Sequence, residues 1–581
     1  MLLAGLALAL TACTGIPTSS APQVIQPVHI GASASPAISP TPGEAPLSLV
    51  QGFLQAGAAD PSGTTSARSF LTTSARVQWA ATSVTIIDNP QYVPYDRSTG
   101  YVGVTGQQVA QINANGVYLP VQGSFQSQFH VTLVDGQYRI DKLPSGLGLL
   151  LTSDEFRNAF HQYPIYFYDL NDQYLVPDYR WTAFSPTDLT DLVQWEVGQL
   201  VSGPRPSMVN TVNQSYTLPS GLGTSNSHVV VTSAPNDPLE IEIPGSSQLA
   251  GDVRNRLAAQ LCQMVAAIQP SGPVMEITDS KVPVEIPAVR SSEFTQASFP
   301  TKGLVPPTPP VGVYYLASGQ LRTGNGSPVA GALGRGQFYL DSVALHPAIE
   351  NAQTLLVAGV AGQDDELAVG TEDLGLRVTN LKNVTTRPTF DPGTDEVWVG
   401  VGKTLERATI SGQSATIASV PIQSLTGPVG SLGVIKAVRM SPEGARIALI
   451  VAGPNNTTQL YVGAVVRQNN QVHVQGLSLL SPSGAVLQDV AWSDGRRLVA
   501  VGYDGSAQNQ RVYDVGVDGS DWTEASTTLA GQLTSVTVAP SQPVWVSTET
   551  DGVSYIWQQI SGGWRAPVKA QTQGGNPVYV E

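Results

Sequence analysis

The spacing of apolar residues changes from helical to extended over residues 46–145. Apolar residues of its first segment recur at steps of three and four: Leu47, Val50, Phe53 and Leu54. Further along, apolar and polar residues alternate through Phe125–Val134, and Asp135-Gly136 separates this run from Gln137–Ile140. Helical spacing predicts a helix, and Asp-Gly between two alternating runs is typical of a β-hairpin. We therefore predict an N-terminal α+β domain over residues 46–145.

A second mixed pattern occupies residues 160–290. Four short runs have the composition of strands: Tyr174–Arg180, His228–Thr232, Leu239–Ile243 and Val274–Ile277. One helix is predicted at Pro186–Val201 and ends at Ser202-Gly203-Pro204. A second helix is predicted from apolar residues at steps of three and four: Leu249, Val253, Leu257, Leu261, Val265 and Ile268. The order of strand, helix, strands, helix and strand predicts an α+β domain built on one sheet.

A proline-rich segment separates these two domains from a region of repeats. Residues 300–310 contain five prolines and predict a semi-rigid linker. In residues 311–581, a short apolar run followed by a turn recurs every 45 to 52 residues, with equivalent positions at Leu345, Phe390, Met440, Trp492 and Val538. Four-stranded propeller blades recur at about this period. We expect a β-propeller of five or six blades, closed where Asn576–Glu581 and Val313–Leu316 share one blade.

Composition agrees with a multidomain, mostly β chain of two α+β domains followed by the propeller. The 581 residues include 57 Gly and 43 Pro, and only 13% are charged, so turns are frequent and long amphipathic helices few. Acidic residues outnumber basic ones by 44 to 29, which gives a net charge of −15. This charge, without a basic stripe, argues against nucleic acid as a ligand.

The first residues have the pattern of a lipoprotein signal peptide. Residues 1–12 are predicted to be the signal peptide, because the apolar run of residues 1–10 is too short to span a bilayer and leads into Leu10-Thr11-Ala12-Cys13. This order fits a bacterial lipobox, so we predict that Cys13 carries a diacylglycerol and anchors the chain to the outer face of the cell membrane. No Lys or Arg precedes Cys13, and we expect the true start to lie upstream of Met1. Residues 13–45, rich in Ser, Pro, Thr and Ala, predict a disordered tether.

The remaining candidate chemistry favours structural roles. Gly402-Lys403-Thr404 resembles the end of a phosphate loop, but the first glycine of that motif is missing and a β-hairpin is favoured. Asp364-Asp365-Glu366 lacks the ligand spacing of a calcium loop, and the six histidines are scattered. Cys262 lies among apolar helical positions, and acylation of Cys13 would leave it unpaired. We therefore predict no metal, no cofactor and no catalytic residues, although a triad assembled only in space stays open.

The assembly resembles the LpqB lipoproteins of actinobacteria from the lipobox through Glu581. Leu200–Pro204 after the first central helix and Gln260–Val265 in the second are similar to the GerMN domain of sporulation and germination proteins. The C-terminal repeats are similar to the family's propeller. The resemblance implies an accessory regulator of the MtrA/MtrB two-component system that contacts the extracellular part of the sensor kinase MtrB and affects cell-wall homeostasis and division. The alternative is an envelope ligand-binding sensor or hydrolase with a site in the propeller channel.

Overall fold

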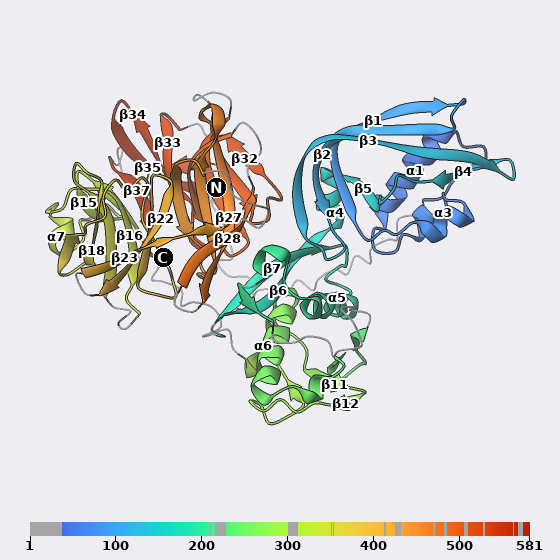
Figure 1. The fold of residues 1–581 in the computed structure, drawn as a ribbon, viewed down its shortest axis with the longest axis horizontal. Coiled ribbons are helices and arrows are strands. Elements are labelled where there is room, and N and C mark those ends of the chain that lie inside the picture. The colour runs from blue at the N-terminus through green and yellow to red at the C-terminus, as the bar shows by residue number, and fades with distance from the viewer. Residues whose placement is uncertain are drawn as a thin grey trace, which may run out of the picture.

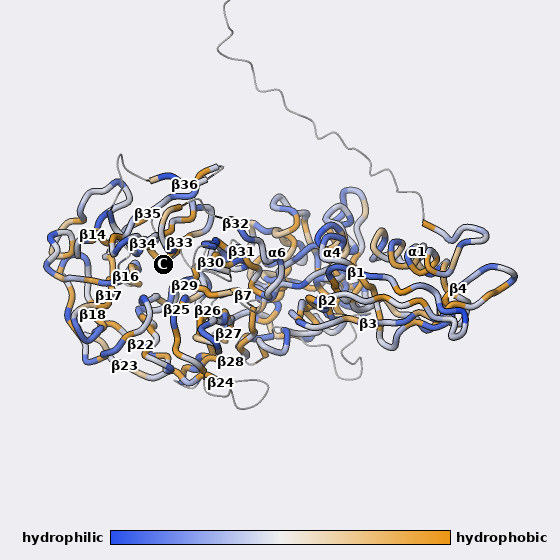
Figure 2. The backbone as a smooth tube through the Cα atoms, turned by 90° about the horizontal axis from the view of Figure 1, so that it is seen from above, coloured by the Kyte–Doolittle hydropathy of each residue, from blue (hydrophilic) through white to orange (hydrophobic). Residues whose placement is uncertain are grey.

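The structure is a computed structural model in which three units follow one another along the chain (Figure 1). It describes residues 38–170, 172, 174–209, 211–214, 228–299, 312–349, 351, 354–411, 414–423, 432–468, 471–480, 485–504, 509–526, 529–561, 563–566 and 573–581. The predicted linker, residues 300–310, lies outside these ranges. Seen from above (Figure 2), the propeller and the N-terminal unit lie at opposite ends, with α6 and β7 between them.

The N-terminal unit is a five-stranded sheet of order β4-β3-β2-β1-β5 with helices packed against it. Its elements are α1 Pro46–Ala59, α2 Thr65–Arg68, α3 Thr73–Gln78, β1 Val84–Asp96, β2 Tyr101–Ile112, β3 Tyr118–Val134, β4 Gln137–Lys142, β5 Leu149–Thr152 and α4 Ser153–Ala159. The predicted hairpin is confirmed, because β3 and β4 pair up to Val134 and Gln137, and Asp135 and Gly136 have the positive φ angles that this tight turn requires. The unit continues past residue 145, since β5 pairs in parallel with β1.

The central unit contains both predicted helices but divides its strands between two sheets. Its elements are β6 His161–Asp169, β7 Leu175–Thr182, α5 Leu189–Ser202, β8 Val212–Asn213, β9 Val230–Thr232, β10 Leu239–Glu242, α6 Gly251–Ile268, β11 Met275–Asp279, β12 Val282–Pro283 and β13 Glu293–Phe294, with 3₁₀ turns η1 Pro206–Met208, η3 Ser246–Gln248 and η4 Gln296–Ser298. One sheet has the order β7-β6-β8, and the other joins β9 to β13.

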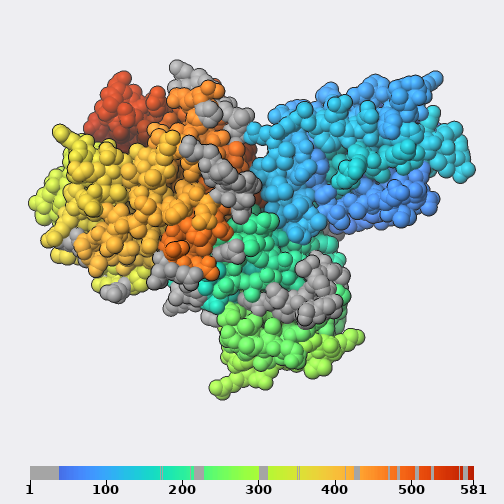
Figure 3. Space-filling model, in the orientation of Figure 1, coloured from blue at the N-terminus to red at the C-terminus, as the bar shows by residue number. Residues whose placement is uncertain are grey.

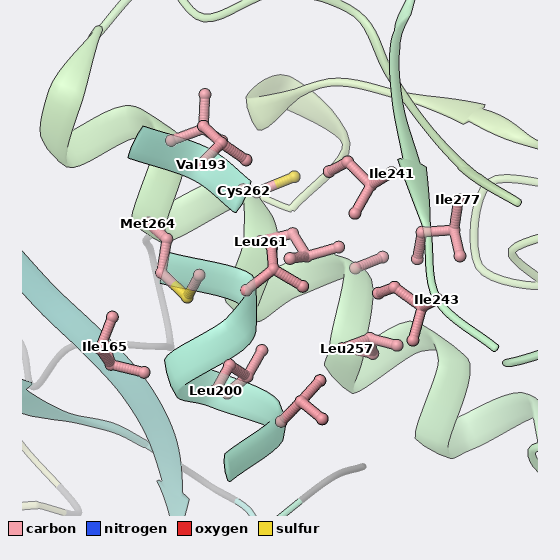
Figure 4. Packing of buried hydrophobic residues seen from close by; sticks show 14 of the residues in the cluster. Ile165, Val193, Leu200, Ile241, Ile243, Leu257, Leu261, Cys262, Met264 and Ile277 are labelled. Atoms are coloured by element: carbon pink, nitrogen blue, oxygen red, sulfur yellow. The ribbon is translucent and has the colours of Figure 1, made fainter. Parts of the chain in front are cut away.

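The expectation of a single central sheet is therefore wrong. The strand predicted at Tyr174–Arg180 pairs antiparallel with β6, a strand that was not predicted from the sequence. Pairing of β7 with β6 closes only a short loop, so it costs less chain entropy than pairing of β7 with a strand beyond α5. Between the sheets, α5 and α6 share one apolar core, in which Leu261 lies among side chains of both helices and both sheets (Figure 4).

A carboxyl group lies inside this core. Glu196 of α5 is fully buried, and neither of its carboxyl oxygens has a hydrogen-bond partner among the described residues. Burial penalises the ionised form and raises the pKa of Glu196 well above its ordinary value of 4.5. The protonated form is therefore the one that this packing tolerates.

Replacing this carboxyl with an isosteric apolar group is expected to stabilise the central unit. Because the pKa of Glu196 is higher in the folded state, the native chain loses stability as pH rises from about 4.5 through that raised pKa. Glu196→Leu should remove this loss and gain roughly 1–3 kcal/mol at neutral pH. Chemical denaturation at pH 4.5 and pH 8 measures the difference. A gain that does not grow with pH, or an equal pH-dependent gain in the exposed control Glu293→Leu, would contradict the assignment.

The C-terminal unit is a β-propeller of six blades, which confirms the predicted fold class. Its elements are β14 Val313–Ala317, β15 Gln320–Thr323, α7 Gly331–Gly334, β16 Leu340–Pro347, β17 Leu355–Ala361, β18 Glu366–Thr371, β19 Gly375–Val378, β20 Thr389–Phe390, β21 Glu396–Val401, β22 Thr404–Ser411, β23 Ser414–Val420, β24 Ile422–Gln423, β25 Ile435–Met440, β26 Arg446–Ala452, η5 Pro454–Asn456, β27 Thr458–Gln468, β28 Gln471–Leu479, β29 Ala485–Trp492, β30 Arg497–Asp504, β31 Gln510–Gly516, β32 Thr523–Ser526, β33 Gln532–Thr537, β34 Trp545–Thr550, β35 Val553–Ile560, β36 Gly563–Arg565 and β37 Gly575–Tyr579. The ring closes as predicted, because β37 pairs with β14 in one blade.

The repeated apolar positions mark the innermost strand of successive blades. Leu345, Phe390, Met440 and Trp492 are all buried. Val538 is only partly buried, because β33 ends one residue earlier and Val538 already belongs to the following loop. The prediction of equivalent buried positions is thus confirmed for four repeats and wrong for the fifth.

Among the described residues, no helix combines the length and the apolar character needed to cross a membrane.

Candidate functional site

The predicted lipid-attachment site cannot be placed in the fold. Cys13 and the lipobox residues Leu10, Thr11 and Ala12 lie outside the described residues. Acylation of Cys13 therefore stays a prediction from the sequence.

Asp518 joins the central unit to the propeller. Its Oδ2 accepts hydrogen bonds from Trp181 Nε1 at 2.8 Å and Gln162 Nε2 at 3.0 Å, both on the β6–β7 sheet. Its Oδ1 accepts from the backbone N and the hydroxyl of Ser520, which holds the propeller loop in place. Asp518 is buried. A buried carboxylate with four donors fixes the relative position of the two units.

The N-terminal unit also contacts the junction between the central unit and the propeller. Pro120 of β3 contacts the propeller loop at Gly519, and an open cavity of about 220 Å³ lies between the three units. Residues from each unit line it, including Pro120, Pro177, Met208, Val462 and Val517. Figure 3 shows the N-terminal unit and the propeller both resting on the central unit. The three units therefore present one continuous surface.

Removing the Asp518 carboxylate should loosen this junction. Asp518→Ala leaves Trp181 Nε1 and Gln162 Nε2 without their acceptor, and each hydrogen bond to a charged group contributes about 1.5–3 kcal/mol. We expect faster proteolysis between residues 160 and 320 and a larger radius of gyration in small-angle scattering. Asp514→Ala is the control, because this half-exposed carboxylate has Arg497 as its only ion-pair partner among the described residues. Its removal should change neither measurement. Equal behaviour of the two variants would contradict the role of Asp518.

A buried ion cluster shapes the central side of the junction. The Asp178 carboxylate is fully buried and contacts Arg180 at 2.6 Å and Arg205 at 2.5 Å. Burial alone would raise the pKa of Asp178, but the guanidinium groups of Arg205 and Arg180 outweigh it and lower the pKa to about 2. Arg205 precedes η1, whose Met208 and neighbours pack against β27 and β28 of the propeller. The cluster thus positions the segment that touches the propeller.

A second polar cluster crosses the propeller channel. Asp489 Oδ1 contacts Arg439 Nη2 at 2.7 Å, and Asp489 Oδ2 lies 3.3 Å from Arg387 Nη2. Arg387 also donates to the carbonyl oxygens of Pro577 and Val536. Burial and then the neighbouring Arg439 lower the pKa of Arg387 to about 10. Because these bonds join inner strands of different blades, the cluster holds the ring together from inside.

His346 and Glu581 extend this cluster toward the first blades. Glu581 Oε2 accepts from Thr389 Oγ1 at 2.9 Å and from the Phe390 backbone N, and His346 Nδ1 lies 2.8 Å from the main-chain oxygen of Glu581. Burial raises the pKa of Glu581 and lowers that of His346. Such a buried carboxylate and histidine in the channel are what a ligand-binding or enzymatic alternative requires. Their bonds, however, run to strands of the ring, and no hydrogen bond among the described residues joins His346 to a hydroxyl or thiol nucleophile.

The channel residues were not predicted from the sequence, although the repeats contain a signal for two of them. Arg387 and Asp489 each lie three residues before the repeated apolar position of their blade. The other repeats have small residues there: Ser342, Ala437 and Ser535. Where two repeats have charged residues at a position that is occupied by small residues in the others, and this position lies on the innermost strand, an ion pair across the propeller axis is indicated.

The other candidate residues have structural roles. Cys262 is buried, burial raises its pKa to about 12, and its thiol lies 3.4 Å from the carbonyl of Thr295. Gly402-Lys403 is the turn of the β21–β22 hairpin, as predicted. Asp364 and Glu366 both contact Lys382 Nζ, at 2.8 and 3.0 Å. Within the described ranges, no three His, Cys, Asp or Glu side chains are grouped so as to hold a metal ion.

Comparison with known proteins gives two family matches and a set of full-length relatives. Residues 39–157 match the model for "Lipoprotein LpqB, N-terminal domain" and residues 317–580 the model for "Lipoprotein LpqB beta-propeller domain". Proteins named Lipoprotein LpqB from Rhodococcus opacus (strain B4) and Mycobacterium bovis (strain BCG / Pasteur 1173P2) are each 26% identical. The match covers 95% of this chain and 93% of the Rhodococcus protein, and 98% and 97% in the Mycobacterium comparison. The crystal structure of TolB from Acinetobacter baumannii is similar over 46% of this chain and 65% of its own, with a TM-score of 0.33 and 13% identity.

Proposed function

Because the chain belongs to the LpqB lipoprotein family of actinobacteria, we propose that it is a membrane-anchored accessory regulator of an MtrA/MtrB-type two-component system. In this proposal, Cys13 holds the protein at the outer face of the cell membrane. The folded units bind the extracellular domain of the sensor kinase and thereby affect cell-wall homeostasis and division. The protein turns over no substrate.

Family membership over nearly the whole chain is the observation that carries this proposal. The relatives are named as lipoproteins and not for a catalysed reaction. The junction adds physical support, because the Asp518 bonds between the central unit and the propeller and the contact of Pro120 with Gly519 hold three units as one large surface that needs little ordering when a partner binds. Anchoring in the partner's own membrane would raise the effective concentration, so that even a weak interface would be occupied.

Phosphorylation of the response regulator tests the proposal in cells. We expect deletion of the gene to change the phosphorylated fraction of the MtrA-type regulator, and expression of the full chain to restore it. Expression of the Cys13→Ala variant should restore it poorly, because the variant is no longer confined beside the kinase. An unchanged phosphorylated fraction after deletion would refute a regulatory role.

A further inference from the structure

The sheet of β9, β10, β11 and β13 in the central unit has one face that packs against helices and one that does not. On the packed face, Ile241 and Ile277 point into the core beside Leu261 of α6 (Figure 4). Side chains alternate along a strand, so the residues between these apolar ones point away from the helices. We call that side the outer sheet face, and its residues are Val230, Thr232, Glu240, Glu242, Val274, Glu276, Thr278 and Glu293. Figure 1 shows β11 at the end of the central unit that lies away from the other two units.

A row of like charges crosses the outer sheet face. Glu276 of β11 lies directly beside Glu240 of β10 on one side and Glu293 of β13 on the other. Glu242 shares a single hydroxyl with Glu240, because Thr278 Oγ1 lies 2.9 Å from Glu242 Oε2 and 3.1 Å from Glu240 Oε1. None of the four carboxylates has an ion pair among the described residues. Like charges opposite each other destabilise a sheet, so folding alone does not favour this row.

Exposed aliphatic side chains flank the row of carboxylates. Val230 is paired with Glu242 across β9 and β10 and is 46% exposed. Val274 comes two residues before Glu276 and is 41% exposed. The outer sheet face thus combines apolar area with negative charge. Nucleic acid and anionic lipid would both be repelled from it, whereas a protein surface with basic and aliphatic side chains complements both properties.

We propose that the outer sheet face binds a partner protein through Lys or Arg side chains set among aliphatic ones. The inference rests on the proposed function, in which that partner is the kinase's extracellular domain. Neighbouring strands lie about 4.8 Å apart, so one cationic group can contact two adjacent carboxylates of the row. Binding then neutralises charges that repel one another in the free protein. Complementary charge of this kind speeds association and selects the partner.

Charge reversal at two positions tests the proposal. The Glu276→Lys/Glu293→Lys variant should bind the kinase's extracellular domain at least tenfold more weakly than native residues 38–581 in isothermal titration calorimetry, because it repels the partner's basic groups. Asp373→Lys/Glu549→Lys is the matched control: it changes the net charge equally at two exposed propeller positions and should bind like the native chain. Native binding should also weaken as sodium chloride rises from about 0.05 M to about 0.5 M.

The valines are tested separately. Val230→Ser removes apolar area from the outer sheet face and should weaken binding about fivefold. Circular dichroism establishes that this variant and both double variants are folded. Native affinity in folded Val230→Ser would overturn the aliphatic part of the proposal.

The possible outcomes separate this inference from the proposed function. If the native chain does not bind the kinase domain, both are contradicted. If the native chain and both folded double variants bind it equally, the outer sheet face is not the site, although the regulatory proposal stands. A metal ion is the other occupant to test. If calcium chloride at about 1 mM raises the thermal transition of the native chain but not that of Glu276→Lys/Glu293→Lys, the face holds a cation and the proposal is overturned.

Discussion

Deletion of residues 576–581 is expected to lower the thermal transition of the propeller by well over 10 °C or to abolish it. The deletion removes most of β37, which pairs with β14 to close the ring. Val578, Tyr579 and Val580 are all buried, and burial of each large apolar side chain contributes roughly 1.5–3 kcal/mol. The burial free energy lost with these three side chains is comparable with the entire free energy of unfolding of a typical domain.

The deletion also breaks the bonds that cross the channel. Arg387 loses the carbonyl oxygen of Pro577 as an acceptor, and the Glu581 side chain no longer accepts from Thr389. Differential scanning calorimetry of the native chain and the deletion variant measures the effect. Tyr579→Phe is the control, because it removes only the hydroxyl that bonds to Trp545 and Pro543 and should cost about 1 kcal/mol. A deletion variant that melts like the native chain would show that β37 does not seal the ring.

Replacement of Cys13 is expected to release the protein from the membrane almost completely. Two acyl chains on Cys13 would bind a bilayer with about 0.8 kcal/mol per buried CH₂, and two such chains are enough for stable anchoring. The rest of the chain opposes binding, because its net charge of −15 repels an anionic lipid surface. Cys13→Ala should therefore move from the membrane fraction to the soluble fraction after secretion.

The second cysteine provides the matched control for this prediction. Cys262 is buried in the central core, where no acyl chain can reach it, so Cys262→Ala should stay in the membrane fraction. Fractionation in high salt weakens purely electrostatic adsorption to the membrane, so it distinguishes a lipid-anchored protein from one that is only adsorbed. Retention of secreted Cys13→Ala in salt-washed membranes would show that another feature anchors the protein.

The propeller could be predicted from the sequence because its repeats are nearly local. Each inner strand carries its apolar residues immediately before a turn, as at Met440 and Trp492, and the same pattern returns with every blade. The blade formed by β14, β15 and β37 is assembled from both ends of the unit and contains no copy of the repeat, so the number of blades stayed open. The extra strand β24 pairs in parallel with β28, a contact that no local pattern indicates.

The central unit and the channel cluster were harder to predict, because both depend on contacts between distant segments. The residues of β6 are buried on both faces over much of its length and lack a clear alternation, so the run was not recognised and β7 was assigned to the wrong sheet. Arg439 and Asp489 are 50 residues apart, and Arg387 lies a further 52 residues before Arg439. Side chains of this kind form a cluster only when the ring has closed.

Titration of the kinase's extracellular domain against residues 38–581 tests the central claim most directly. Isothermal titration calorimetry or biolayer interferometry should show saturable one-to-one binding to the MtrB-type domain and none to the extracellular domain of an unrelated sensor kinase. The account predicts a dissociation constant in the micromolar range, since confinement to one membrane makes higher affinity unnecessary. If the folded protein binds neither domain at concentrations of about 1 mM, it does not act by binding the kinase, and the regulatory account is contradicted.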